Sequence, residues 1–369
     1  MKTNQKIIFL SSLFLSIIIG STINFGMVDV SADPIVGLHD TIFIDPTQDD
    51  MSWKDCPYVT GSGAKSNPYK LQDLIIDADE SGSGIRIENS EKYVLIENCT
   101  ITNSGYLAQD AGITLMRCDN VIIRNCTFIE NYKGIYSAYG EFNQVLNCDF
   151  INNSRIGLYP YVSKNGIYSG NYICGSEQMG LYSHFSVGDT FQGNHIEFNF
   201  KGTVIFEGLE HIYSNNYIIN STSNGLEVYD TKNTTITQNK VMYNGHGIQV
   251  KEASSFNKIY YNIFSKNVGN QGYDDGSGIN DWDNGTHGNF WGDYSTRYPS
   301  AHSENGMWDL KYHISGSRND DNFPLVEAPT LNLNYISEES TGIPGFNIPI
   351  MILYTAAVSV FLLFKRKIN

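Results

Sequence analysis

Residues 202–224, GTVIFEGLEHIYSNNYIINSTSN, and residues 225–246, GLEVYDTKNTTITQNKVMYNGH, are two copies of one pattern. Each copy opens with a glycine, and each contains short apolar runs separated by Asn, Ser, Thr or Gly. Such runs, bounded by turn-forming residues, predict β-strands joined by tight turns. Because this region contains no stretch with the 3.6-residue apolar period of an amphipathic helix, the pattern indicates an all-β fold.

The pattern continues in both directions as two series of markers that keep one period. The glycine series is Gly84, Gly112, Gly134, Gly157, Gly180, Gly202, Gly225 and Gly247, and the second series is Cys99, Cys126, Cys148, Asn171, Asn194, Asn216, Asn239 and Asn262. After first steps of 28 and 27 residues, every step in both series is 22 or 23 residues. Two independent series with the same period indicate a structural repeat.

A coil of three short strands and three turns accommodates this repeat. When coils stack ~4.8 Å apart, each strand forms hydrogen bonds with its copies above and below. One coil cannot bury its apolar side alone, so stacking supplies the stability. A leucine-rich horseshoe requires a dense leucine signature that this sequence lacks, and a propeller blade requires about twice the period. The repeat therefore predicts a parallel β-helix, with eight or more coils of 22–23 residues, over residues 84–267.

The second marker series predicts a polar ladder along the axis. Asn tolerates the left-handed backbone of a tight turn, and stacked amides form hydrogen bonds with one another. In three consecutive coils a cysteine takes this position: Cys99, Cys126 and Cys148. Their Cβ atoms would lie ~4.8 Å apart with parallel orientation, slightly beyond disulfide geometry. We therefore expect stacked, buried thiols there.

The open ends of a β-helix expose unpaired strand edges, which must be covered. We expect residues 33–83 to form an N-terminal cap with Trp53 and Tyr69 as apolar plugs, and residues 268–327 to form C-terminal coils and a second cap. Four aspartates crowd this second segment: Asp274, Asp275, Asp281 and Asp283. Carboxylates can hold Ca²⁺, but their spacing matches no EF-hand loop, and solvated turn aspartates are the favoured interpretation. No other cofactor is expected.

The N-terminus carries the pattern of a secretory signal. Two lysines precede an apolar run at residues 7–20, and small residues at 30–32 offer a cleavage site. This combination predicts a signal peptide over residues 1–32.

The C-terminus carries the pattern of a membrane anchor. Residues 348–364 are uncharged and are followed by a basic triplet at residues 365–367. The apolar run predicts one membrane span after a linker at residues 328–347, and the triplet places residues 365–369 in the cytoplasm. The expected location is the extracellular face of the cytoplasmic membrane.

The net charge of the chain limits the kinds of partner that it can bind. With 24 Lys and Arg against 39 Asp and Glu, the formal net charge is −15, which argues against nucleic acid. The expected partners are a polysaccharide or glycan and, through the C-terminal helix, a membrane. The chain is expected to be monomeric.

Several segments resemble the pectate-lyase-type right-handed parallel β-helix proteins, especially the NosD type found among archaeal cell-surface proteins. They are residues 66–69, 74–77 and 82–85 at the entry of the helix, and residues 283–291 and 319–325 at its exit. Pro344-Gly345-Phe346 resembles the PGF-CTERM sorting signal, which in that family precedes removal of the span and attachment of a lipid. The resemblance covers about residues 40–326 and implies the fold.

The resemblance also implies a role in copper-site maturation, to which NosD-type proteins are linked. The eight His and eight Met form no close-spaced cluster of soft ligands. We therefore predict no metal site and rank metal delivery lowest among the candidate functions.

The strand after each marker glycine predicts an outward-facing aromatic stripe, because side chains alternate in and out along a strand. Its second and fourth positions supply Tyr136, Tyr159, Tyr161, Tyr182, His184, Phe206, Glu227 and Tyr229. Aromatic rings bordered by carboxylates suit sugars, which offer C–H faces and hydroxyl groups. The alternative is that Tyr and Phe are simply good strand formers. We predict substrate binding by this stripe.

The fifth position predicts three stacked acids: Glu207, Asp230 and Glu252. Carboxylates one or two coils apart would be separated by ~5 or ~10 Å, which resembles the retaining and inverting arrangements of glycosidases. Like-charge crowding could raise the pKa of one of them into the general-acid range. Because any stacked repeat generates these spacings, the geometry discriminates poorly, and the prediction favours a protein that is not an enzyme.

Three functions stay open at this point. The first is a surface module that binds polysaccharide without cleaving it, and the second is a polysaccharide lyase or glycoside hydrolase that uses the three acids. The third is a passive spacer or adhesin, in which the rod holds its tip away from the membrane.

Overall fold

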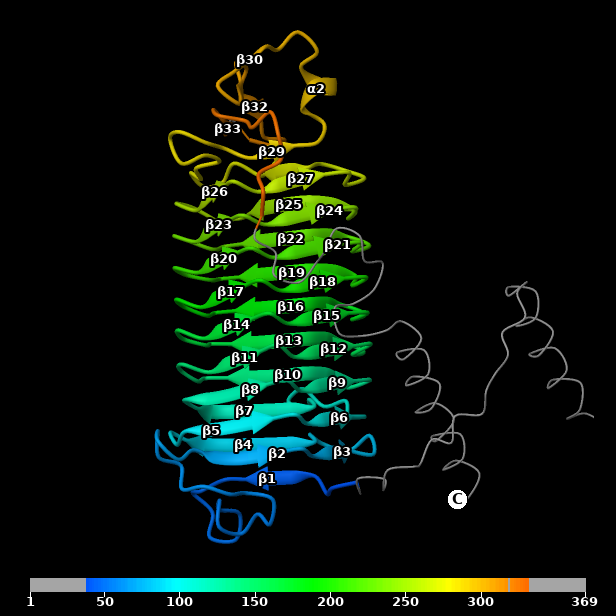
Figure 1. The fold of residues 1–369 in the computed structure, drawn as a ribbon, viewed down its shortest axis with the longest axis vertical. Coiled ribbons are helices and arrows are strands. Elements are labelled where there is room, and N and C mark those ends of the chain that lie inside the picture. The colour runs from blue at the N-terminus through cyan, green and yellow to red at the C-terminus, as the bar shows by residue number, and fades with distance from the viewer. Residues whose placement is uncertain (1–37, 318, 332–369) are drawn as a thin grey trace, which may run out of the picture. The chain divides into compact units, whose positions relative to one another are not determined.

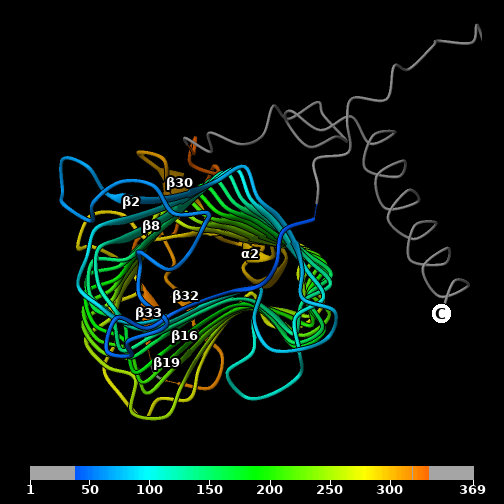
Figure 2. The same cartoon turned by 90° about the horizontal axis from the view of Figure 1, so that it is seen from below.

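A computed structural model describes residues 38–317 and 319–331, and in it three parallel sheets wind around one axis (Figures 1 and 2). The predicted signal peptide and membrane anchor lie outside these residues. Within the described part of the chain, no helix has the length and apolar character needed to cross a membrane.

Each coil contributes one strand to each of three sheets. Sheet I contains β1 (Ile42–Ile44), β4 (Ile85–Ser90), β7 (Ile113–Cys118), β10 (Lys133–Ala138), β13 (Ile156–Tyr161), β16 (Met179–His184), β19 (Lys201–Phe206), β22 (Asn224–Tyr229), β25 (His246–Lys251) and β28 (Gly272–Asp274). Sheet II contains β2 (Tyr69–Gln72), β5 (Val94–Glu97), β8 (Val121–Arg124), β11 (Gln144–Leu146), β14 (Ile167–Ser169), β17 (Thr190–Gln192), β20 (Ile212–Ser214), β23 (Thr235–Thr237) and β26 (Lys258–Tyr260). Sheet III contains β3 (Ile75–Asp77), β6 (Thr100–Thr102), β9 (Thr127–Ile129), β12 (Asp149–Ile151), β15 (Tyr172–Cys174), β18 (His195–Glu197), β21 (Tyr217–Ile219), β24 (Lys240–Met242), β27 (Ile263–Ser265) and β29 (Phe290–Trp291).

The predicted all-β right-handed parallel β-helix is confirmed, with about ten turns. Sheet I starts at β1 and sheets II and III at β2 and β3, so residues 69–77 of the segment expected as a cap already lie in coils. Short elements follow the last coil: α2 (Tyr294–Arg297), β30 (Ser303–Glu304), β31 (Met307–Trp308), β32 (Tyr312–His313) and β33 (Asp320–Asp321).

The core consists of columns of equivalent side chains. The apolar residue after each marker glycine is buried, and register places Ile135 between Ile113 and Leu158. Thr203 takes the same column, where its hydroxyl pairs with the Tyr213 hydroxyl at 2.7 Å, so the one polar member is satisfied.

The marker glycines form a column because neighbouring coils approach closely there. A Cβ atom on Gly180 would lie 2.8 Å from the carbonyl oxygen of Gly202, and one on Gly202 would lie 2.5 Å from the carbonyl oxygen of Gly225. Equivalent glycines therefore lie one above another, as the period predicts. Any side chain would push the coils apart.

The asparagine ladder is present and buried. The Asn171 amide donates to Asn194 Oδ1 at 3.0 Å, and Asn194 donates to Asn216 in the same way at 2.9 Å. The expectation that these residues adopt left-handed backbone was wrong, because the left-handed residue comes one position earlier, as at Asn215 and Gln238 (φ 55° and 57°). The turn residue faces solvent and the ladder residue faces the core.

The three ladder cysteines are stacked, free and buried, as predicted. The backbone N–H of Cys99 donates to Cys126 Sγ at 3.4 Å. The neighbouring Cys126 thiol and burial raise the pKa of Cys99, so this sulfur is held as an inert thiol.

Aromatic side chains close both ends of the coils. Trp53 is buried and stacks on Tyr69 with 4.4 Å between ring centroids. At the other end Trp291 stacks on Tyr312 at 4.1 Å, and its Nε1 donates to the buried carboxylate of Asp321 at 2.8 Å. These contacts cover the strand edges of the terminal coils.

Candidate functional site

Sheet I brings the predicted stripe residues together on its outer face. Register pairs Tyr161 with His184, His184 with Phe206, and Phe206 with Tyr229, so the fourth positions form one column. Tyr136 pairs with Tyr159 in the neighbouring column. We call Tyr136, Tyr159, Tyr161, Tyr182, His184, Phe206 and Tyr229 the aromatic stripe.

Many rings of the aromatic stripe stack face to face on one another. Tyr159 stacks on Tyr182 at 4.8 Å, and Phe206 stacks on Tyr229 at 4.7 Å with an interplanar angle of 7°. Tyr161 differs, because it meets Tyr159 and His184 at angles of 63° and 65°. The stripe therefore offers ring edges and hydroxyl groups as much as ring faces.

Two predicted binding residues are buried, which corrects the expectation that they face solvent. Tyr136 is 8% exposed and packs with Ala111, Met116 and Ala138 in a small apolar cluster outside the core. Residues 103–112, which join β6 to β7, supply Ala111 to this cluster. Tyr136 is therefore unavailable to a large ligand.

Glu227 is the second buried residue, at 7% exposure. Its carboxylate lies 2.8 Å from Lys201 Nζ and 3.5 Å from Lys251 Nζ, and it accepts from Asn224 Nδ2 at 2.5 Å. Burial alone would raise its pKa, but these partners hold the pKa of Glu227 below its usual range. By pairing with lysines of β19 and β25, the Glu227 carboxylate links its own strand β22 to both neighbours.

The three predicted acids, which we call the acidic row, lie in turns immediately after the strands of sheet I. Glu207, Asp230 and Glu252 all have left-handed backbone, with φ of 50°, 44° and 54°. The Glu207 N–H donates to the Tyr229 carbonyl at 2.8 Å, which places one coil's turn on the next. Burial, a hydrogen bond to Glu252 and the charges of Asp230 and Glu207 raise the pKa of the Tyr229 hydroxyl.

The carboxylates of Asp274 and Asp283, in the C-terminal coils, accept hydrogen bonds from N–H groups of the protein. Asp274 is buried, and its Oδ2 accepts from Asn280 Nδ2, Trp282 Nε1 and Asn319 Nδ2 at 3.2, 3.3 and 2.8 Å. Asp283 accepts the backbone N–H of Gly285 at 2.8 Å. Carboxylates surrounded by N–H donors disfavour a bound cation. Among residues 38–317 and 319–331, no three His, Cys, Asp or Glu side chains are placed to hold a metal ion.

A second polar cluster, which the sequence analysis missed, lies on the outer face of sheet III. The Tyr172 hydroxyl donates to Glu197 Oε1 at 2.7 Å, and His195 Nε2 lies 3.6 Å from Glu197 Oε2. Burial raises the pKa of nearby Asp149 to about 6. The in-and-out alternation, applied to the strands after the Cys/Asn markers, would have found these residues.

Comparisons with known proteins place the chain in a family context. The family model described as periplasmic copper-binding protein (NosD) matches residues 58–296. No curated protein matches the sequence significantly.

Three solved structures are among those similar to this chain. A double mutant of the periplasmic alginate epimerase AlgG is 19% identical, with 55% of this chain and 58% of that chain covered and a TM-score of 0.45. The A-module of the Azotobacter vinelandii mannuronan C-5 epimerase AlgE6 is 12% identical, with 67% and 70% covered and a TM-score of 0.45. A DFA-IIIase mutant from Arthrobacter chlorophenolicus A6 is 10% identical, with 58% and 59% covered and a TM-score of 0.44. This chain thus spans less than two thirds of the first of these structures, and none of them assigns a substrate to it.

Proposed function

The chain belongs to the family of periplasmic copper-binding proteins of the NosD type, and we propose that it is an extracellular, membrane-anchored member that binds polysaccharide along sheet I. The open part of the aromatic stripe, beside the acidic row, carries this proposal. Rings supply apolar contact, while tyrosine hydroxyls and carboxylates supply the hydrogen bonds that sugar hydroxyls require.

Copper, which the family description implies, does not fit the described side chains. His184 and His195 lie on different sheets, the three ladder cysteines are buried, and the pKa values of Cys99 and Cys126 are raised. No set of three suitable ligands converges among residues 38–317 and 319–331.

The open part of the stripe extends from β13 to β22. Tyr159, Tyr161, Tyr182, His184 and Phe206 are half-buried, so each is fixed by its neighbours and still reaches solvent. The Tyr159 hydroxyl lies 3.2 Å from His184 Nδ1, which fixes both side chains relative to each other. A preformed row of this kind binds without a large loss of side-chain entropy.

A binding experiment tests the proposal. We expect Tyr161→Ala with Tyr182→Ala to weaken binding to a polysaccharide panel at least about tenfold, because two central aromatic contacts are lost. The matched control is Tyr243→Ala with Phe256→Ala, which removes exposed rings from the turns before and after β25, outside the aromatic stripe. Undiminished binding by the first variant, or equal loss in the control, would contradict the proposal.

The anchor requires a separate test. Removal of residues 348–369 should release the protein from the membrane fraction, because the apolar span is then lost. Replacement of the basic residues 365–367 by Ser should leave it in that fraction. Membrane association that survives removal of residues 348–369 would refute anchoring by this segment.

The acidic row supports lyase or hydrolase activity as a second candidate, since its three carboxylates lie at equivalent positions of successive coils and, together with burial, raise the pKa of the Tyr229 hydroxyl beside them. If the protein cleaves a polysaccharide of the panel, assays for new reducing ends and for unsaturated products should detect the cleavage. The Asp230→Asn variant should then have lost this activity. Cleavage unchanged by this substitution would place the chemistry elsewhere.

A further inference from the structure

One end of the aromatic stripe is covered by an insertion that no other coil carries in the repeat region. Residues 103–112 join β6 to β7, whereas residues 130–132 make the same connection in the next coil. We call residues 103–112 the covering loop. Its Gln109 carbonyl accepts from Thr114 Oγ1 at 2.7 Å, and its Ala108 carbonyl accepts from Lys133 Nζ at 2.9 Å.

The covering loop closes the outer face of sheet I over β7 and β10. Thr114, Met116 and Ala138 point away from the core, yet all three are buried. The stripe is therefore blocked at Tyr136 and open from β13 onward. A long ligand that lies along the open part meets an obstacle at this end.

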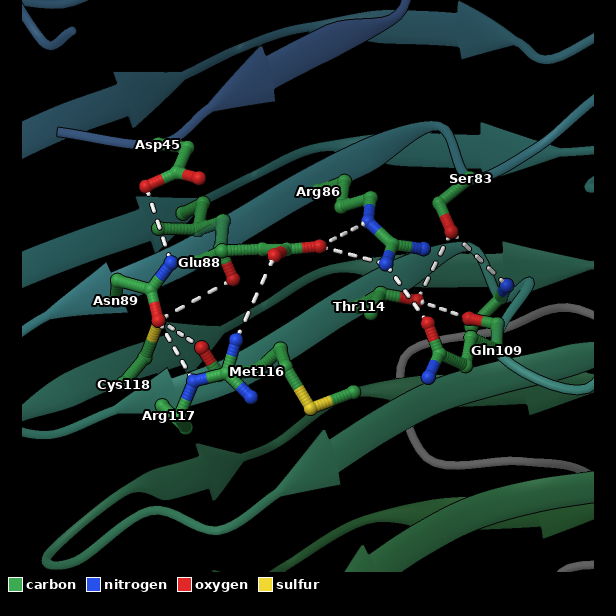
Figure 3. Close-up of polar contacts among 12 residues, drawn as sticks. Asp45, Ser83, Arg86, Glu88, Asn89, Gln109, Thr114, Met116, Arg117 and Cys118 are labelled. Atoms are coloured by element: carbon green, nitrogen blue, oxygen red, sulfur yellow. Dashed lines mark hydrogen bonds and ion pairs between the residues drawn. The ribbon is translucent and has the colours of Figure 1, made fainter. Parts of the chain in front are cut away.

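A network of charged side chains fixes the surface beside this obstacle (Figure 3). Glu88 Oε1 lies 2.6 Å from Arg86 Nη2, and Arg86 Nη2 also donates to Gln109 Oε1 of the covering loop at 2.8 Å. Arg117 Nε donates to Asn89 Oδ1 at 2.6 Å, and Asn89 Nδ2 donates to Asp45 at 3.1 Å. The hydrogen bond to Asn89 thus fixes the Nε side of the Arg117 guanidinium.

The Arg117 side chain nevertheless reaches solvent, with 57% exposure. One of its nitrogens is used by Asn89, and Glu88 lies at 4.0 Å, so further N–H donors of the guanidinium remain for a ligand. Tyr139 lies in the adjacent turn and meets Tyr161 edge-on at 5.3 Å. Because Met116 pairs with Ala138 in register, Tyr139 lies one coil from Arg117, on the side of the open stripe.

Arg117, near the end of β7, lies at the position that the acidic row occupies in later coils. Its φ of 53° matches those of Glu207, Asp230 and Glu252, and each of these residues follows the outward position of a sheet I strand. Four coil steps separate Arg117 from Glu207, or ~19 Å. This exceeds the Debye length of ~8–10 Å in physiological salt, so the acidic row has little effect at Arg117. The carboxylate paired with Arg117 is that of Glu88, at 4.0 Å, and Glu88 is shared with Arg86, which lies closer at 2.6 Å.

We propose that sheet I binds the end of a glycan chain whose terminal sugar carries a carboxylate, with that carboxylate on Arg117 and the covering loop stopping the chain. The proposal rests on the proposed polysaccharide binding. A guanidinium pairs with a carboxylate through two parallel N–H donors, which gives both affinity and direction.

The test uses the full-length protein and oligomers of galacturonate, mannuronate and hyaluronan, each with its methyl ester and its long polymer. We expect at least one acidic oligomer to bind, with affinity about tenfold or more above its ester. Arg117→Asn should remove this preference, because Asn keeps the left-handed turn but lacks the guanidinium. Arg124→Asn is the control, since Arg124 is 46% exposed and pairs with Glu97 on sheet II.

The polymers report on end recognition. If the protein binds chain ends, saturation depends on the concentration of ends. The dissociation constants of polymer and oligomer should therefore agree when ligand concentration is expressed as the concentration of chain ends. Binding that scales with polymer mass, or that survives Arg117→Asn with its ester discrimination intact, overturns the inference. If neutral polysaccharides bind and no acidic oligomer does, the inference fails while the proposed function stands. If nothing binds, both fail.

Discussion

Asp189 is a carboxylate in a column where some coils use an amide and the two adjacent coils carry Gly166 and His211, and replacing it with Asn should stabilise the protein at neutral pH. The column lies just before the strands of sheet II and includes Asn143 and Asn257. Asn257 Nδ2 donates to the carbonyl of Thr231 at 2.8 Å. At the equivalent place Asp189 Oδ1 accepts the Gly166 N–H at 2.7 Å, while Oδ2 has no partner among the described residues.

The magnitude follows from the pKa of this group. Burial raises the pKa of Asp189 from 3.8 to about 7, although the Gly166 N–H and the Ser163 hydroxyl partly oppose the effect. The folded state thus binds the proton more tightly than the unfolded state, and stability falls as pH rises from 3.8 to about 7. The full loss is roughly 4 kcal/mol. Asn cannot ionise, and its Nδ2 can donate to a carbonyl as in Asn257.

Urea unfolding of the full-length protein at pH 4, 6 and 8 measures the effect. Asp189→Asn should match the natural protein within ~1 kcal/mol at pH 4 and exceed it by roughly 4 kcal/mol at pH 8. Asp50→Asn, at an exposed position of the N-terminal segment, should change neither value appreciably. An equal gain at pH 4 and pH 8 would mean that ionisation of Asp189 is not the cause.

Three further outcomes test the packing. Asn216→Ala removes a ladder amide that accepts from Asn194 at 2.9 Å and donates to Asn239 at 3.0 Å. Urea unfolding should show that the free energy of unfolding falls by about 3 kcal/mol or more. Gln192→Ala, at an exposed position, should change it little. Gly202→Ala places a Cβ 2.5 Å from the next coil's carbonyl oxygen and should lower the unfolding midpoint; an unchanged midpoint would refute the close-approach explanation. Burial raises the pKa of Cys118 to about 12, so iodoacetamide followed by mass spectrometry should modify half-buried Cys56 well before Cys118, and the reverse order would contradict the burial.

The sequence predicted the core of this fold well because its marker columns are set by local stacking. A glycine or an amide every 22 or 23 residues is required wherever coils touch, so these constraints are visible without a structure. The left-handed turn residue was placed one position too late, because Asn is frequent both in the turn and in the ladder. Asn215 and Asn216 stand side by side, and only their backbone angles distinguish them.

The outer surface was harder to predict because it depends on where insertions fold. The 28-residue step between Gly84 and Gly112 revealed that extra residues are present. It did not reveal that they lie back over sheet I and bury Tyr136. Burial of Glu227 has a similar origin, since its lysine partners come from the strands on either side. Charges on adjacent coils pair across the sheet, and alternation along one strand cannot anticipate this.

Free hydrogen-bonding capacity separates the two polar clusters more clearly than their residue types do. On sheet III, Glu197 has Tyr172 on one oxygen and His195 near the other, and the side chains of His195 and Glu197 are each only 14% exposed. The hydrogen bond from Tyr172 and the nearby His195 ring hold Glu197 in place, while His195 Nε2 is buried without a hydrogen-bond partner among the described residues, so solvent and ligands reach little of this cluster. On sheet I, Arg117 near the end of β7 and Glu207 and Glu252 in the turns after β19 and β25 are exposed to solvent. Because a ligand can compete only for groups that still offer donors or acceptors, recognition of a charged sugar is expected beside sheet I and not at the chemically richer cluster on sheet III.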